Sequence, residues 1–143
     1  MRKIDYIFVH CTASPQSWGV EELRQEFANK GWKNPGYHYV VTADGGVHQM
    51  LAVEEVSNGV HGHNSQSINI AYVGGIEKVG GKMRGVDNRT PQQHAALRTL
   101  LKTLRKTCYF AKIMGHRDIW GKDPAKWYKE CPCFDAEAEY KDI

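Results

Sequence analysis

The 143-residue sequence lacks the features of membrane-spanning, secreted and nucleic-acid-binding proteins. No stretch approaches the roughly 20 apolar residues that cross a bilayer. The apolar run at residues 4–9 is interrupted by Asp5, so it does not resemble a signal peptide, and we expect a cytoplasmic location at synthesis. A formal net charge of +3 is too small to predict a nucleic-acid partner.

Several common catalytic motifs are also missing. The chain has no Gly-x-Ser-x-Gly elbow, no phosphate-binding loop and no His-Glu-x-x-His helix, which leaves serine-hydrolase, nucleotide-binding and zincin functions without support. Only four cysteines are present. Without an export signal, metal binding or free thiols are favoured over a disulfide.

The pattern of apolar residues predicts one α/β domain over residues 1–143. The length suits a single domain, and the 41% apolar content is ordinary for a globular protein. Strands are predicted at 4–9, 37–42, 47–50, 68–73 and 111–114, and helices at 20–30 and 91–106. Because helices and strands alternate around one hairpin, we expect a central mixed sheet flanked by helices. Segments 57–66 and 75–88 are expected to be loops, and the tail at 135–143 a short helix.

The helix at 91–106 carries the clearest local signals. Thr90 and Gln93 form a capping box around Pro91, and four leucines with helical spacing follow them. Such a stripe predicts a helix that packs its apolar face on the sheet.

Three residues far apart in the sequence could form a hydrolytic metal site. His10 ends the first predicted strand, His116 follows the last one, and Cys131 lies in a loop. Imidazole and thiolate are ligands that Zn²⁺ prefers, and three of them leave one position for a water molecule whose pKa the metal lowers to about 7. Taken singly, each histidine could be a surface residue. Cys131-Pro-Cys133 could also be a structural zinc half-site or a buried thiol, although its spacing does not fit a zinc finger.

Five further polar residues are candidates for the same site. Tyr37 and Lys129 are donors that could stabilise an oxyanion. Tyr37 could equally be an aromatic residue of the core, and Lys129 a solvated surface charge. His61 and Asn64 could line a polar groove or lie in an exposed loop. Thr12, beside His10, could bind a substrate or simply end the strand.

Four ordered segments resemble the zinc-dependent N-acetylmuramoyl-L-alanine amidases, the family of phage lysozyme-type endolysins and animal peptidoglycan recognition proteins. The segments are Phe8-Val9-His10-Cys11-Thr12-Ala13, Gly31-Trp32 with Gly36-Tyr37-His38-Tyr39, Ser67-Ile68-Asn69-Ile70 with Val73-Gly74-Gly75-Ile76, and Gly115-His116-Arg117-Asp118 with Lys129-Glu130-Cys131-Pro132-Cys133-Phe134-Asp135. The resemblance extends from about Asp5 to Asp135.

This resemblance implies an α/β domain with a groove that holds Zn²⁺. It assigns His10, His116 and Cys131 as zinc ligands and Tyr37 and Lys129 as catalytic residues, and it places His61 and Asn64 near the substrate. The implied reaction is hydrolysis of the amide between N-acetylmuramic acid and L-alanine in peptidoglycan, by a monomeric phage or prophage endolysin.

A muropeptide-binding module that does not cut is the alternative. Recognition proteins of that kind resemble the same pattern but typically lack the cysteine ligand that Cys131 matches. Two departures from the family are visible. Cys133 stands where Ser or Thr is expected, and the longer spacer at 117–128 predicts an extra lip on the groove.

Overall fold

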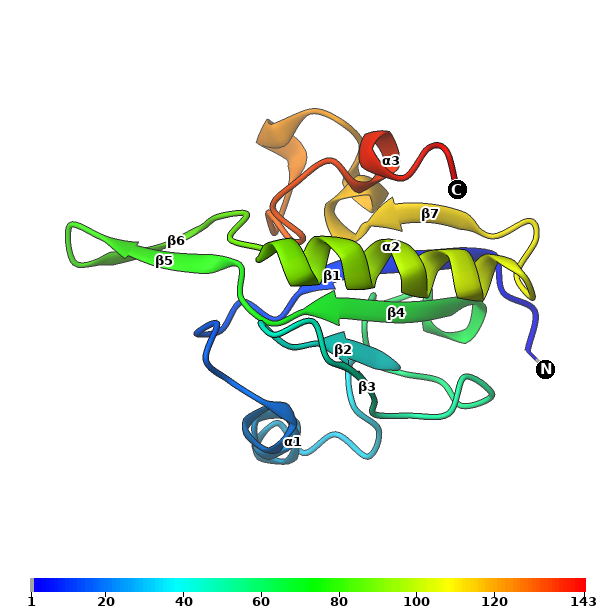
Figure 1. The fold of residues 1–143 in the computed structure, drawn as a ribbon, viewed down its shortest axis with the longest axis horizontal. Coiled ribbons are helices and arrows are strands. Elements are labelled where there is room, and N and C mark those ends of the chain that lie inside the picture. The colour runs from blue at the N-terminus through cyan, green and yellow to red at the C-terminus, as the bar shows by residue number, and fades with distance from the viewer. Residues whose placement is uncertain (1) are drawn as a thin grey trace.

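A five-stranded mixed sheet forms the centre of the computed structural model, which describes residues 2–143 (Figure 1). Its strands run in the order β3-β2-β4-β1-β7. They comprise β1 (Tyr6–Cys11), β2 (Tyr39–Val41), β3 (Val47–Gln49), β4 (Ser67–Tyr72) and β7 (Lys112–Gly115). Strand β1 is parallel to both β4 and β7, β2 is parallel to β4, and only β3 is antiparallel to its neighbour. The predicted α/β class with a mixed sheet is confirmed.

The predicted elements are present, with shifted ends. Strand β1 begins and ends two residues later than the predicted 4–9, because its pairing with β4 runs from Tyr6 to Cys11. His10 therefore lies inside the strand. Helices α1 (Val20–Asn29) and α2 (Pro91–Arg105) each end one residue before the predicted boundary.

The prediction of a loop at residues 75–88 is wrong. Strands β5 (Ile76–Val79) and β6 (Lys82–Gly85) form an antiparallel hairpin that projects from the body of the molecule (Figure 1). Its turn, Gly80-Gly81, has positive φ angles of 58° and 80°, which glycine adopts readily. The hairpin is largely exposed, so it has no alternation of buried and exposed residues that the sequence could reveal.

The remaining helical segments are short. They are the 3₁₀ helices η1 (Asn64–Gln66), η2 (His116–Trp120) and η3 (Pro124–Lys126) and the helix α3 (Ala136–Glu139), which lies in the tail where a short helix was predicted. Within residues 2–143, no helix combines the length and the apolar character needed to cross a bilayer.

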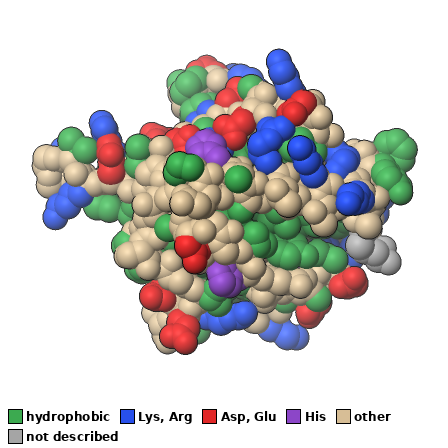
Figure 2. Space-filling view, viewed as in Figure 1, with side chains coloured by type: hydrophobic (Ala, Val, Ile, Leu, Met, Phe, Trp, Pro, Cys, Tyr) green, Lys and Arg blue, Asp and Glu red, His purple; other side chains and the backbone are tan. Residues whose placement is uncertain are grey.

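Helix α2 covers one face of the sheet. Its side chains Leu97, Leu100, Leu101 and Leu104 pack against alternate residues of the central strands, which point toward the helix: Ile7, Val9, Ile68, Ile70 and Tyr72. At its start Thr90 Oγ1 accepts a hydrogen bond from Gln93 N at 3.1 Å, as the capping box predicts. Figure 2 shows hydrophobic side chains beside this helix, where Val47 and Leu100 border a shallow groove.

Helix α1 covers part of the opposite face with only two buried residues, Leu23 and Phe27. Because side chains alternate along a strand, Phe8 and His10 point to this face while Ile7 and Val9 point to α2. Polar side chains are therefore buried on the α1 side of the sheet.

Candidate metal centre

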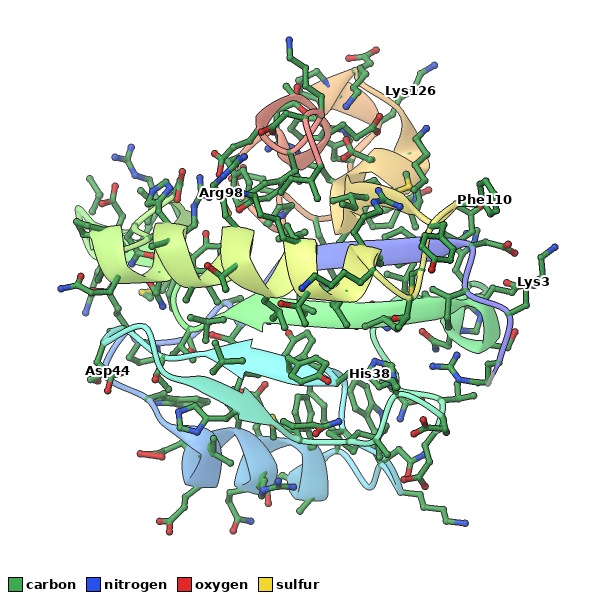
Figure 3. The ribbon with its side chains drawn as sticks, turned by 45° about the vertical axis from the view of Figure 1, so that its right-hand side comes forward. Lys3, His38, Asp44, Arg98, Phe110 and Lys126 are labelled. Atoms are coloured by element: carbon green, nitrogen blue, oxygen red, sulfur yellow. The ribbon has the colours of Figure 1, made fainter. Side chains whose placement is uncertain are left out.

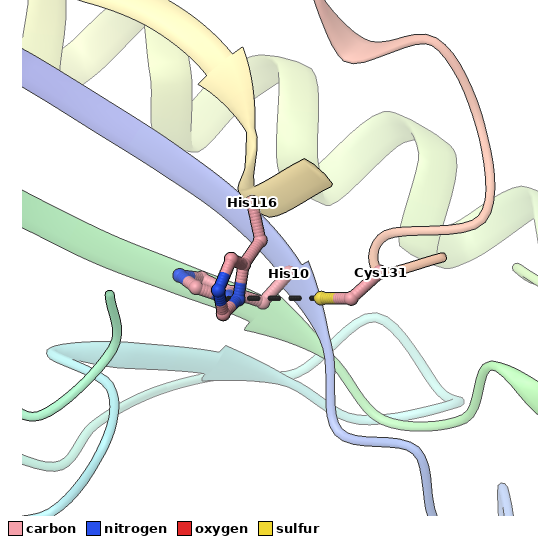
Figure 4. Close-up of side chains that lie close together, drawn as sticks. All are labelled: His10, His116 and Cys131. Carbon is pink, nitrogen blue, oxygen red and sulfur yellow. Dashed lines mark hydrogen bonds between the residues drawn. The ribbon is translucent and has the colours of Figure 1, made fainter. Parts of the chain in front are cut away.

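Parallel pairing of β1 and β7 places His10 and His116 side by side. Val9 is in register with Gly115, so the residues that follow them, His10 in β1 and His116 directly after β7, lie next to each other at the same edge of the sheet. The two Nδ1 atoms lie 3.2 Å apart, and Cys131 Sγ lies 3.7 Å from His10 Nδ1 (Figure 4). The three candidate ligand atoms all lie within 4.8 Å of one another. The structure thus brings together the three residues that the sequence singled out.

The loop that carries Cys131 is tied to the ends of both strands. The backbone N–H of Cys11 donates to Cys131 Sγ at 3.2 Å, and that of Arg117 donates to Cys131 O at 2.9 Å. Pro132 packs against Gly115, where a Cβ atom would lie 2.7 Å from the proline Cδ. Glycine is needed at 115 because any side chain there would push the cysteine loop away from the histidines.

Hydrogen bonding and burial leave both imidazoles neutral. His10 Nε2 donates to Asn69 Oδ1 at 2.7 Å, so the lone pair of His10 is on Nδ1 and faces the cluster. Burial, with a smaller contribution from Lys129, lowers the pKa of His10 to about 4. Burial, followed by the charges of His10 and Lys129, lowers the pKa of His116 to about 3. Neutral imidazole is the form that coordinates a metal.

The donor set fits Zn²⁺. Two buried imidazole nitrogens and one half-buried thiol converge, and nitrogen and sulfur donors of this kind suit zinc better than the oxygen-preferring Mg²⁺ or Ca²⁺. Three protein ligands would leave one tetrahedral position open.

Tyr37 and Lys129 both line the pocket of about 400 Å³ above this cluster. The Tyr37 ring centroid lies 5.2 Å from that of His10, and its hydroxyl donates to Cys11 O at 3.3 Å. Burial raises the pKa of Tyr37 well above its usual value, which keeps this hydroxyl protonated. Lys129 is exposed, and its charge reaches both histidines, since it depresses both of their pKa values.

The three predicted substrate residues differ in position. Thr12 lines the pocket, but its Oγ1 is 2.6 Å from Ser14 Oγ and accepts from Gly74 N at 3.0 Å, so it already holds the loop together. His61 is exposed, and Asn64 Oδ1 accepts from Val60 N at 2.8 Å. Neither belongs to the pocket lining. Their substrate contacts stay predictions.

Other walls of the pocket were not predicted from the sequence. They come from α1 and the loops beside it: Glu26, Lys30, Trp32 and Asn58. Lys30 Nζ lies 4.8 Å from the centroid of the Trp32 ring. In the sequence, the only signal that these residues could line a pocket was the polar face of α1 followed by Trp32. Asn69 was also missed, although an amide inside an otherwise apolar strand was a usable signal.

Cys133 does not join the cluster. Its Sγ lies 3.6 Å from Gly75 O, on the side of the β5–β6 hairpin, and its hydrogen bond with Cys11, together with burial, raises the pKa of its thiol. None of the residues of the spacer at 117–128 lines the pocket, and the extra lip stays a prediction. Trp120 of this spacer stacks on His116 with ring centroids 5.4 Å apart.

Comparisons with known proteins agree with this geometry. A family profile described as N-acetylmuramoyl-L-alanine amidase matches residues 1–134. The endolysin of Enterobacteria phage K11 is 38% identical over 132 residues, which are 91% of this chain and 81% of that protein. The solved structure of the Ph2119 endolysin from a Thermus scotoductus bacteriophage matches with a TM-score of 0.72 and 26% identity, over 92% of this chain and 79% of that one.

A second solved structure shows how far the fold extends beyond sequence similarity. The amidase LysCS from Clostridium intestinale has a TM-score of 0.77 at 20% identity and covers 98% of this chain and 85% of its own. At that identity the likeness shows the fold alone. The profile match and the identity to the K11 endolysin show more: this chain belongs to the N-acetylmuramoyl-L-alanine amidase family.

Proposed function

We propose that this protein is a zinc-dependent amidase that hydrolyses the bond between the lactyl group of N-acetylmuramic acid and the L-alanine of the stem peptide in peptidoglycan. The observation that carries the proposal is the convergence of His10, His116 and Cys131 at the base of a pocket lined by Tyr37 and Lys129. The similarity to phage endolysins supports the role of an endolysin. We propose further that the protein reaches the cell wall after synthesis in the host and works as a monomer.

The residues of the chain would divide the work of this reaction. Bound by His10, His116 and Cys131, Zn²⁺ would supply a Lewis acid and lower the pKa of a water molecule into the neutral range. The Lys129 ammonium would stabilise the negative charge that develops on the carbonyl oxygen of the scissile amide. The protonated Tyr37 hydroxyl would donate a hydrogen bond to the same oxygen, because its bond to Cys11 O is long enough to be exchanged.

The pocket walls would orient the substrate. Trp32 offers an aromatic face, and Lys30 and Asn58 offer donors to the carboxylates, carbonyls and hydroxyls of a muropeptide. We therefore place the stem peptide and sugar against these walls.

Digestion of purified peptidoglycan tests the activity. Wild-type protein with one zinc per chain should release stem peptides with free L-alanine amino termini, seen by mass spectrometry, and should create no new reducing ends in the glycan. The Cys131→Ser variant is the matched control, and it should release none. Wild-type protein that carries zinc and binds peptidoglycan without releasing peptides would contradict the amidase proposal and favour a binding module.

A further inference from the structure

The side chain of Asn69 is fully buried in strand β4 and contacts a candidate metal ligand directly. We propose that Asn69 is a positioning residue, which fixes the tautomer and the ring orientation of His10 so that Nδ1 is presented to the metal. This inference rests on the zinc site proposed above. The Asn69 amide touches neither the substrate nor the metal, and it acts only through His10.

The hydrogen bonds of the Asn69 amide fix its orientation. Its Nδ2 donates to Ser57 Oγ at 2.8 Å and approaches Ser67 Oγ at 3.3 Å, which occupies the nitrogen with two hydroxyl groups. The amide oxygen faces His10, and an oxygen can only accept. The proton of His10 must then be on Nε2, and the other tautomer would place two acceptors against each other.

A second buried histidine holds Ser57 in place. His38 Nε2 donates to the carbonyl of Glu55 at 2.8 Å, so its Nδ1 is an acceptor. That Nδ1 accepts the backbone N–H of Asn69 at 3.0 Å and lies 3.2 Å from Ser57 Oγ. Burial lowers the pKa of His38, which keeps it neutral and preserves this acceptor. Figure 3 shows His38 beside β2.

The donors and acceptors form one directed chain. His10 donates to Asn69, Asn69 donates to Ser57, the Ser57 hydroxyl shares the lone pair of His38 Nδ1 with the backbone N–H of Asn69, and His38 donates to the Glu55 carbonyl. Every group in the chain has its partner, and exchanging the donor and acceptor atoms of either His10 or Asn69 would bring two acceptors or two donors together at their contact. Partners of this kind around a metal-bound histidine commonly contribute 10–100-fold in metal affinity.

The backbone also confines the Asn69 side chain. A Cβ atom on Gly59 would overlap the amide of Asn69, which shows that the main chain at 59 lies directly against it. On β1, Phe8 is in register with Asn69, so the amide lies two residues before the level of His10 on the neighbouring strand and on the same face. The side chain is confined enough to aim a neighbouring ring.

Zinc affinity measured by competition with a chromophoric chelator tests the proposal. Asn69→Leu keeps the volume and removes the acceptor, and we expect zinc to bind about 10–100-fold more weakly. Asn69→Asp restores an acceptor at the same place, and its affinity should return to within about threefold of wild type, in line with the carboxylate partners seen at other zinc histidines. If Asn69→Leu does not fold, Asn69→Ala replaces it, with the same expected loss.

Gln93→Leu is the matched control. Gln93 is another fully buried amide, and it donates to the carbonyls of Val41 and Val73 on the α2 side, away from the cluster. Folded Gln93→Leu should be less stable in thermal unfolding yet bind zinc like wild type. Equal zinc affinity in Asn69→Leu and wild type, or an equal loss in Gln93→Leu, would overturn the proposal.

His10→Ala separates this proposal from the one on which it rests. Weaker zinc binding in His10→Ala with unchanged binding in Asn69→Leu and Asn69→Ala would remove only the positioning role. Unchanged binding in His10→Ala would remove the zinc site itself. The visible spectrum of the cobalt-substituted protein gives a second readout, since a misplaced His10 should alter the ligand-field bands in Asn69→Leu and leave them unchanged in Gln93→Leu.

Discussion

The two faces of the central sheet are built on different principles. On the α2 side, four leucines of one helix pack on the aliphatic side chains of β1 and β4, and the layer is almost wholly apolar. On the α1 side, the helix contributes only Leu23 and Phe27, and the same strands present His10 and Asn69. One face supplies the apolar packing, and the other carries the polar side chains that form the candidate active site.

This difference follows from the alternation of side chains along β1 and β4. Burial of apolar area on the α2 side contributes stabilising free energy that can offset the cost of burying imidazoles and an amide on the other side. That cost stays small because the buried side chains of His10, Asn69 and His38 have hydrogen-bond partners. The comparison predicts that changes on the two faces will affect different measurements.

Cys131→Ser should give the largest effect. Loss of the thiolate removes one of three ligands, so we expect zinc content and peptidoglycan hydrolysis to disappear together while the fold remains, because Cys131 is only half-buried. Metal analysis, a turnover assay and circular dichroism measure the three quantities. Full activity in this variant would remove Cys131 from the ligand set.

A pair of leucine truncations compares the faces directly. Leu101→Ala on α2 and Leu23→Ala on α1 each open a cavity at a fully buried site, and each should lower the free energy of unfolding by about 2–5 kcal/mol. Only Leu23→Ala should also raise KM, because α1 provides Glu26 and Phe27 to the pocket. Denaturant titration and steady-state kinetics are the measurements. A higher KM in folded Leu101→Ala would contradict the proposal that the α2 side contributes to stability alone.

The α2 side was also the part that the sequence predicted best. The capping box at Thr90 and the leucine stripe are local signals, and the helix they predict is present almost to the residue. The candidate ligands could be predicted from residue chemistry and from the place of the two histidines near the ends of predicted strands, with Cys131 in a loop. Asn69 and the pocket walls could not, because their roles depend on which strands are neighbours and on where α1 docks. The β5–β6 hairpin was missed because it packs against too little to leave a periodic pattern.

Lys129→Ala should have a smaller effect than loss of a ligand. The lysine is exposed and is not among the metal-binding group, so zinc should remain bound while turnover falls roughly 10²-fold, as when one oxyanion donor is removed. Stoichiometric zinc analysis beside a kcat measurement checks both parts. A fall in zinc content would instead make Lys129 a structural residue of the site.

The smallest effect is expected at the edge of the α2 side. Arg89 pairs with Asp87 at 2.8 Å and with Glu139 at 2.6 Å, stacks 3.4 Å from the centroid of the Phe134 ring, and lowers the pKa of both carboxyls. Carboxyls with lowered folded-state pKa values stabilise the protein above their unfolded pKa values and lose that contribution as the pH falls.

Arg89→Met should therefore flatten the acid limb of the stability curve. Between about pH 6 and pH 3, wild type should lose about 1 kcal/mol more unfolding free energy than the variant, a modest figure because both carboxylates are partly solvated. Urea titrations at each pH measure the difference. Parallel curves for the two proteins would show that the ion pairs contribute nothing to stability.

X-ray absorption at the zinc edge tests the central claim most directly. The account predicts one zinc per chain with a single sulfur neighbour at about 2.3 Å and two imidazole nitrogens at about 2.0 Å. Cys131→Ser should show no bound zinc, and Cys133→Ser should keep the single sulfur, because the thiol of Cys133 lies toward Gly75. A shell with two sulfurs, or with no imidazole, would contradict the assignment of His10, His116 and Cys131.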